Sequence, residues 1–95
     1  MKVEFSGPLF EWRGPSPYHF VALPPEACED VSELAAEVTY GWGVVPVSVV
    51  IGSTDFTTSL IPREGGYLLP VKDTVRRAEG LNLDDVVVVA LTVGR

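Results

Sequence analysis

Residues 66–93 constrain the fold of this chain more than any other stretch. Residues 67–71 have the apolar character of a strand, residues 72–79 suit two turns of helix, and Gly80 stands where helices commonly end in a left-handed residue. An acidic turn then leads into residues 86–93, whose valines give the strongest β preference in the sequence. This order of strand, short helix, turn and strand predicts a mainly β protein.

Alternating apolar residues predict further strands earlier in the chain. In residues 44–51, Val45, Val47, Val49 and Ile51 fall on one face of an extended segment, as expected of a strand that covers a core. The other expected strands are residues 3–5 continuing through 9–12, residues 18–23 and residues 56–62. Turns at residues 52–55 and 63–66 contain glycine, so neighbouring strands are expected to form antiparallel hairpins.

One longer helix is expected between Pro24 and Gly41. Proline suits the first helical position, where its missing N–H would have no helical partner. One apolar stripe has helical spacing and consists of Val31, Leu34, Ala35 and Val38. The opposite face is acidic, which predicts a solvated surface or, less favoured, a docking site for a basic partner.

Together these patterns predict a small, partly open β-barrel of about six strands with two short helices. We expect a single domain over residues 1–95, with an α+β classification as the alternative. The apolar runs are too short to span a bilayer, and the N-terminus lacks the apolar core of a signal peptide. The sequence therefore predicts a soluble cytoplasmic protein without a membrane partner.

The charge of the chain argues against binding to nucleic acid. The net charge is −6, and five of the thirteen acidic residues lie between Pro24 and Gly41, where there is no lysine or arginine. Such a face would be repelled by a phosphate backbone. Cys28 is the only cysteine, so no internal disulfide is possible. Neither composition nor charge indicates the oligomeric state.

An ordered set of short motifs resembles the bacterial domain-of-unknown-function family nineteen-oh-five. The motifs are Tyr18-x-Phe20-Val21-x-Leu23-Pro24, Gly43-Val44-Val45-Pro46-Val47-x-Val49-x-Ile51-Gly52, Phe56-Thr57-Thr58-Ser59-Leu60, Gly65-Gly66-Tyr67-x-Leu69-x-Val71, Val75-Arg76-x-Ala78-x-Gly80-Leu81 and Asp85-x-Val87-x-Val89. The resemblance covers nearly the whole chain and implies a small, partly open barrel with no assigned activity. A C-terminal extension linked by name to bacteriocin protection occurs in some relatives, and its role is not carried over to this chain.

A weaker local similarity covers residues 69–89. Pro70 and Arg76 ahead of Gly80, followed by an acidic turn and a strand, are similar to the swapped-hairpin regulators and antitoxins of the AbrB and MazE type. Those proteins usually have Gly-Asp before the last strand, where this chain has Asp84-Asp85. Asp tolerates left-handed dihedral angles, so the turn is still expected to form. The similarity implies a DNA-binding regulator as an alternative function.

Four residues are the candidates for a ligand-binding site at one barrel end: Trp42, Arg63, Lys72 and Arg76. The three cations form the one basic cluster that the sequence suggests, which indicates an anion-binding site. The favoured alternative is that Arg76 pairs with Asp84 or Asp85 and holds the turn. Trp42 lies between two glycines and is expected either to plug the barrel end or to form a binding surface.

No set of residues predicts catalysis, a metal site or a cofactor. His19 is the only histidine and lies within an apolar strand, so we expect a structural role. Cys28 begins an acidic helix, and the opposing effects of helix and acids predict an ordinary thiol. An enzyme remains the last-ranked alternative, with Asp55, Asp84 and Asp85 as its only candidates. The main prediction is a non-enzymatic module that binds a small molecule or a protein partner.

Overall fold

The computed structural model describes residues 2–12, 18–35 and 44–94. Eight elements follow one another along the chain: β1 (Lys2–Trp12), β2 (Tyr18–Ala22), α1 (Pro25–Ala35), β3 (Val45–Ile51), β4 (Thr54–Arg63), β5 (Gly66–Val71), α2 (Asp73–Glu79) and β6 (Val86–Val93). Within these ranges, neither helix is long and apolar enough to cross a membrane.

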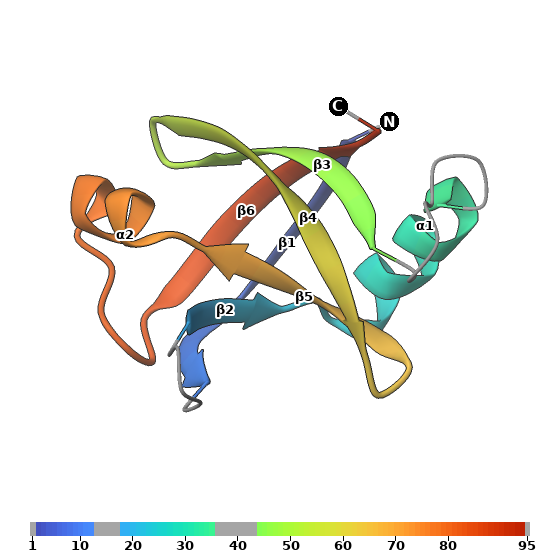
Figure 1. The fold of residues 1–95 in the computed structure, drawn as a ribbon, viewed down its shortest axis with the longest axis horizontal. Coiled ribbons are helices and arrows are strands. Elements are labelled where there is room, and N and C mark those ends of the chain that lie inside the picture. The colour runs from blue at the N-terminus through green and yellow to red at the C-terminus, as the bar shows by residue number, and fades with distance from the viewer. Residues whose placement is uncertain (1, 13–17, 36–43, 95) are drawn as a thin grey trace.

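The six strands form a closed barrel in the order β1-β2-β5-β4-β3-β6, with antiparallel neighbours throughout (Figure 1). This confirms the mainly β barrel and its two short helices. The ring is closed rather than partly open, because β1 and β6, from the two ends of the chain, pair from Lys2 opposite Thr92 to Pro8 opposite Val86. Closure leaves no strand at an open edge of the ring.

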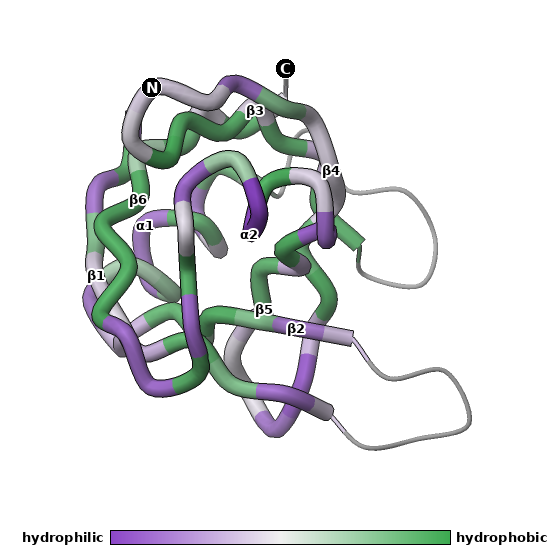
Figure 2. The backbone as a smooth tube through the Cα atoms, turned by 90° about the vertical axis from the view of Figure 1, so that its left-hand side faces the viewer, coloured by the Kyte–Doolittle hydropathy of each residue, from purple (hydrophilic) through white to green (hydrophobic). Residues whose placement is uncertain are grey.

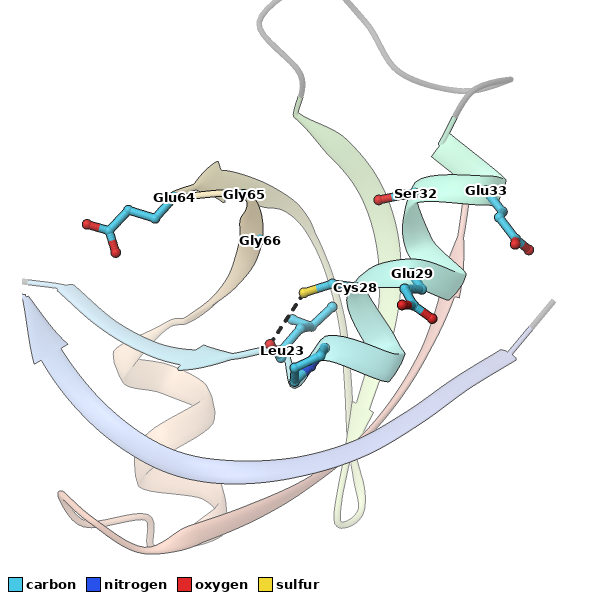
Figure 3. A pocket seen from close by; sticks show the side chains of 9 residues that line it. Leu23, Cys28, Glu29, Ser32, Glu33, Glu64, Gly65 and Gly66 are labelled. Atoms are coloured by element: carbon cyan, nitrogen blue, oxygen red, sulfur yellow. Dashed lines mark hydrogen bonds between the residues drawn. The ribbon is translucent and has the colours of Figure 1, made fainter.

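Strand β1 contributes to two pairings because it changes partner part of the way along. Its first part pairs with β6, and from Leu9 onward it pairs with β2. The change falls directly after Gly7-Pro8. The backbone of Leu9 also exchanges hydrogen bonds with the turn before β6, at 2.9 Å to the Asp85 carbonyl and 2.8 Å from the Asp84 N–H. This strand is long and strongly curved (Figure 3).

The barrel interior is built by the alternation that the sequence predicted. Val45, Val47, Val49 and Ile51 are all buried in one core cluster, together with Leu60 from β4. Inward residues of the other strands complete the cluster: Val3, Phe5, Leu9, Val21, Leu69, Val71, Val87, Val89 and Leu91. Because side chains of a strand alternate between its faces, the residues between these point outward.

The two helices lie at opposite ends of the barrel (Figure 1). In Figure 2, which is turned by 90° from Figure 1, α2 lies in front and α1 lies behind it. Helix α1 buries Ala27, Val31 and Ala35 in the core and leaves its acidic residues exposed, as its sequence pattern predicted. Helix α2 buries Val75 and ends at Gly80, which adopts φ 63° as expected. Val38, the last residue of the predicted stripe, lies outside the described residues.

Candidate functional site

The outer face of the barrel carries an apolar cluster that is separate from the core. Phe20 and Leu68 alternate with the core residues Val21 and Leu69, so they point away from the barrel interior. They are nevertheless only 8% and 9% exposed. Phe20 is covered by two aromatic neighbours, with ring centroids 6.0 Å away for Phe10 and 6.2 Å away for Tyr18. Packed aromatic side chains therefore cover the outside of β1 and β2.

A hollow of about 210 Å³ opens beside this cluster. Its lining comes from four neighbouring strands of the ring and consists of Trp12, Tyr18, Phe20, Ile61, Pro62, Arg63 and Leu68. We call these seven residues the aromatic groove. Trp12 is 39% exposed, Tyr18 56% and Ile61 40%, so the side chains at the rim of the groove are large, apolar and open to solvent. Exposed apolar patches of this kind commonly mark binding surfaces.

Arg63 is the charged side chain of the aromatic groove. Its Cζ lies 3.8 Å from the centroid of the Trp12 ring, which is a cation–π contact. The β4–β5 hairpin holds it there, because Arg63 pairs with Gly66 across a two-residue turn. Both turn residues have positive φ, 49° at Glu64 and 81° at Gly65, as a tight hairpin requires. The Glu64 carboxylate lies 3.8 Å from the Arg63 guanidinium.

The structure does not bring Arg63 together with the other two predicted cations, Lys72 and Arg76. Arg63 stands beside the start of β5, whereas Lys72 follows the end of that strand and occupies the position before α2. A strand of this length separates its two ends by about 20 Å. Lys72 is exposed, and Arg76 lies on α2. The predicted Trp42 lies outside the described residues.

Arg76 does not pair with Asp84 or Asp85, which corrects the favoured prediction. Its Nη1 donates to Asp73 at 3.2 Å, one turn earlier on the same helix. The Asp85 carboxylate instead accepts a hydrogen bond from the Asn82 N–H at 2.8 Å and closes its own turn. Asp84 adopts φ 70°, so the left-handed turn expected from the Asp-Asp pair is present.

His19 lies between two carboxylates that the sequence did not associate with it. Glu11 is opposite His19 across the β1–β2 pairing, and its Oε2 is 3.7 Å from Nε2. The Oδ1 of Asp73, at the start of α2, is 4.0 Å from Nδ1. Both separations exceed a hydrogen bond. The His19 side chain is only 11% exposed and does not line the hollows described in this section.

A second hollow of about 660 Å³ lies between α1 and the β4–β5 turn (Figure 3). Cys28 lines it and donates a hydrogen bond from its thiol to the Leu23 carbonyl oxygen at 3.4 Å. Acidic residues surround it, but the side chains of Glu33 and Glu64 point away from each other in Figure 3. In the described ranges, no three His, Cys, Asp or Glu side chains are grouped to hold a metal ion.

Sequence reasoning identified one residue of the aromatic groove, Arg63, and missed its aromatic members. The available signal was the alternation in β2, where Tyr18 and Phe20 occupy the face opposite Val21. Two large aromatic residues on the outside of a barrel strand need an explanation, because that face normally meets water. Trp12 just before them in the chain strengthens the same signal.

The sequence model of the DUF1905 family, described as a domain of unknown function, matches residues 5–91 of this chain. The match covers β2 to β5 and α2 entirely and all but the ends of β1 and β6. It therefore includes every residue of the aromatic groove. No match was found among curated proteins.

Proposed function

We propose that this chain, which belongs to the DUF1905 family of domains of unknown function, is a non-enzymatic module. It binds a small apolar ligand in the aromatic groove. The observation that carries this proposal is the position of the aromatic residues. Phe20 and Leu68 are nearly buried although they lie outside the barrel core, and Trp12 and Tyr18 extend that apolar surface into solvent.

The arrangement has an energetic cost in the absence of a ligand. Each exposed aromatic ring leaves apolar area in water that would contribute about 25 cal/mol per Å² if it were covered. A groove with an apolar floor and a rigid strand framework offers a ligand this stabilisation without reorganising the backbone. Trp12 and Tyr18 are held by strand pairing opposite each other, so the rim is already formed.

The surroundings of His19 support a non-enzymatic role. General acid–base catalysis needs a titratable group within reach of a bound substrate. His19, Glu11 and Asp73 are close together, but none of the three lines the aromatic groove. The ligand we propose therefore meets apolar side chains and Arg63.

The net charge of −6 favours a small-molecule ligand over DNA. The same negative charge argues against the alternative function as a DNA-binding regulator, whereas the aromatic groove favours ligand binding. We also propose that the protein acts in the cytoplasm, as expected from the short apolar runs of its sequence.

A thermal-shift screen of small aromatic compounds tests the proposal. Hits should raise the melting temperature of the wild-type protein and lose most of that effect in Trp12→Leu, which removes one of the two exposed aromatic rings of the groove. Val88→Leu is the matched control, because Val88 is an exposed apolar residue of β6 outside the groove. Hits that stabilise Trp12→Leu as much as wild type would contradict the proposal.

A further inference from the structure

The aromatic groove combines one planar cation with an apolar lining. Its side-chain polar groups are the Arg63 guanidinium, the Tyr18 hydroxyl and the Trp12 indole N–H. Arg63 is the only one of these that carries a full charge at neutral pH. A ligand that uses the whole groove must therefore have an apolar body and a single anionic group beside it.

The stacking of Arg63 on Trp12 determines which kind of anion fits. A guanidinium is planar, and all its N–H donors point outward in that plane. With Cζ 3.8 Å from the Trp12 centroid, one face of the plane is occupied by the indole, while the donors at its edge are left for another partner. A carboxylate matches the edge of a guanidinium with two parallel hydrogen bonds.

Glu64, the present partner of Arg63, does not prevent a ligand carboxylate from binding to the guanidinium. Glu64 lies 3.8 Å away, beyond hydrogen-bond distance, and its side chain is 83% exposed. Exposed ion pairs of this kind contribute little to stability. A ligand carboxylate that is also held by apolar contacts can replace Glu64 at small cost.

The size of the groove limits the apolar body to about one ring. Pockets that hold drug-sized ligands have volumes of roughly 300–1,000 Å³. The hollow here is about 210 Å³. Its lining includes two exposed aromatic rings, Trp12 and Tyr18, against which a ligand ring can stack or lie edge to face.

We propose that the aromatic groove binds small one-ring aromatic carboxylates, with the ligand ring against Trp12 and Tyr18 and its carboxylate on the edge of Arg63. This inference rests on the proposed function and adds the chemical class of the ligand. Arg63 then selects the acid over neutral compounds of the same shape.

Matched probes and NMR titrations test this inference with the full chain. Benzoate is compared with benzamide, which lacks the charge, and with cyclohexanecarboxylate, which lacks the aromatic ring. The indole N–H signal of Trp12 reports on the groove, and its loss in Trp12→Phe assigns it among the two tryptophans. We expect benzoate to bind about tenfold more tightly than benzamide and several-fold more tightly than cyclohexanecarboxylate, because it alone offers both the charge-assisted pair and the ring.

Variants of charged residues show which side chain causes the preference for benzoate over benzamide. Arg63→Gln should abolish the preference for benzoate over benzamide while leaving benzamide binding in place. Arg63→Lys, which keeps the charge without the planar fork, should retain part of the preference. Lys72→Gln removes one positive charge at the other end of β5 and should leave the preference unchanged. Glu64→Gln should tighten benzoate binding about twofold, because it removes the competing carboxylate.

The outcomes separate this inference from the proposed function. If benzamide and benzoate shift the Trp12 signal with equal affinity, or if Lys72→Gln acts like Arg63→Gln, the assignment of an acid ligand is overturned and the groove remains a binding site. Equal binding of cyclohexanecarboxylate and benzoate overturns the aromatic requirement. If no probe shifts the Trp12 signal while the variants keep the wild-type backbone spectrum, both the ligand class and the proposed function are overturned.

Discussion

Glu79, the last residue of α2, accepts a hydrogen bond from the Thr54 hydroxyl at 2.5 Å. Thr54 begins β4 directly after the β3–β4 turn, and Ser53 in that turn donates to the same carboxylate at 3.5 Å. Helix α2 is thus held on the barrel by two residues one turn apart, the buried Val75 and Glu79, which lie on the same face of the helix. A seven-residue helix needs such tertiary contacts, because isolated helices of this length are unstable in water.

Removing the Glu79 carboxylate should destabilise the protein. Glu79→Ala loses a partly buried hydrogen bond to a charged group, which predicts a decrease of about 1–2 kcal/mol in the free energy of unfolding. Urea unfolding followed by circular dichroism measures it. Glu33→Ala, an exposed acid on α1, is the control and should change stability by less than about 0.5 kcal/mol. Equal effects of the two variants would show that the Glu79 contact contributes nothing.

Gly52 should be intolerant of a side chain for two separable reasons. It has φ 59°, and a Cβ at this position would collide with the Glu79 carboxylate. Gly65 also has positive φ, at 81°, but a Cβ there would meet open space. Gly65→Ala should therefore cost about 1 kcal/mol, and Gly52→Ala more, because it also displaces Glu79 from Thr54.

A double-mutant cycle with Glu79→Ala isolates the collision at Gly52. In the Glu79→Ala background, the cost of Gly52→Ala should fall to that of Gly65→Ala, since only the unfavourable φ remains. Additive effects in the cycle would contradict the predicted coupling between these two residues.

Much of the barrel could be predicted from local pattern. Period-two alternation placed Val45, Val47, Val49 and Ile51 on one face, and all four are in the core. Turn chemistry predicted the two hairpins that join β3, β4 and β5. Closure could not be predicted in this way, because the β1–β6 and β2–β5 pairings join segments distant in the chain and depend on the whole ring.

The inward and outward faces should respond very differently to truncation. Leu60 is fully buried in the core, so Leu60→Ala should cost about 2–5 kcal/mol through lost burial and the cavity left behind. Val88 is 71% exposed on β6, so Val88→Ala should change stability by less than about 0.5 kcal/mol. Thermal and urea unfolding provide both values. A large cost at Val88 would mean that this outer face of β6 is covered.

Asp84 should tolerate glycine and asparagine but not a β-branched residue. Its φ of 70° is left-handed, a conformation that costs most residues about 1–2 kcal/mol. Asp84→Gly should therefore be neutral or slightly stabilising, and Asp84→Val should lower the free energy of unfolding by more than about 1 kcal/mol. If both variants have the same melting temperature as wild type, the turn does not require this conformation.

The candidate site shows where sequence reasoning ends. Arg63 was recognised as a charged residue of a turn, but its contact with Trp12 depends on the ring order, in which β2 and β5 lie between β1 and β4. Of the neighbours of His19, Glu11 lies across the β1–β2 pairing of consecutive strands, whereas Asp73 comes from α2. The contacts of Trp12 with Arg63 and of His19 with Asp73 join segments distant in the chain, so local patterns carry no signal for them.

We propose that this protein binds its ligand in the aromatic groove. The most direct measurement is backbone amide chemical-shift mapping with the compounds that raise the melting temperature in the thermal-shift screen. We predict that the largest shifts cluster at Trp12, Tyr18, Ile61 and Arg63. Shifts concentrated instead around Cys28 or along α2 would show that the ligand binds elsewhere.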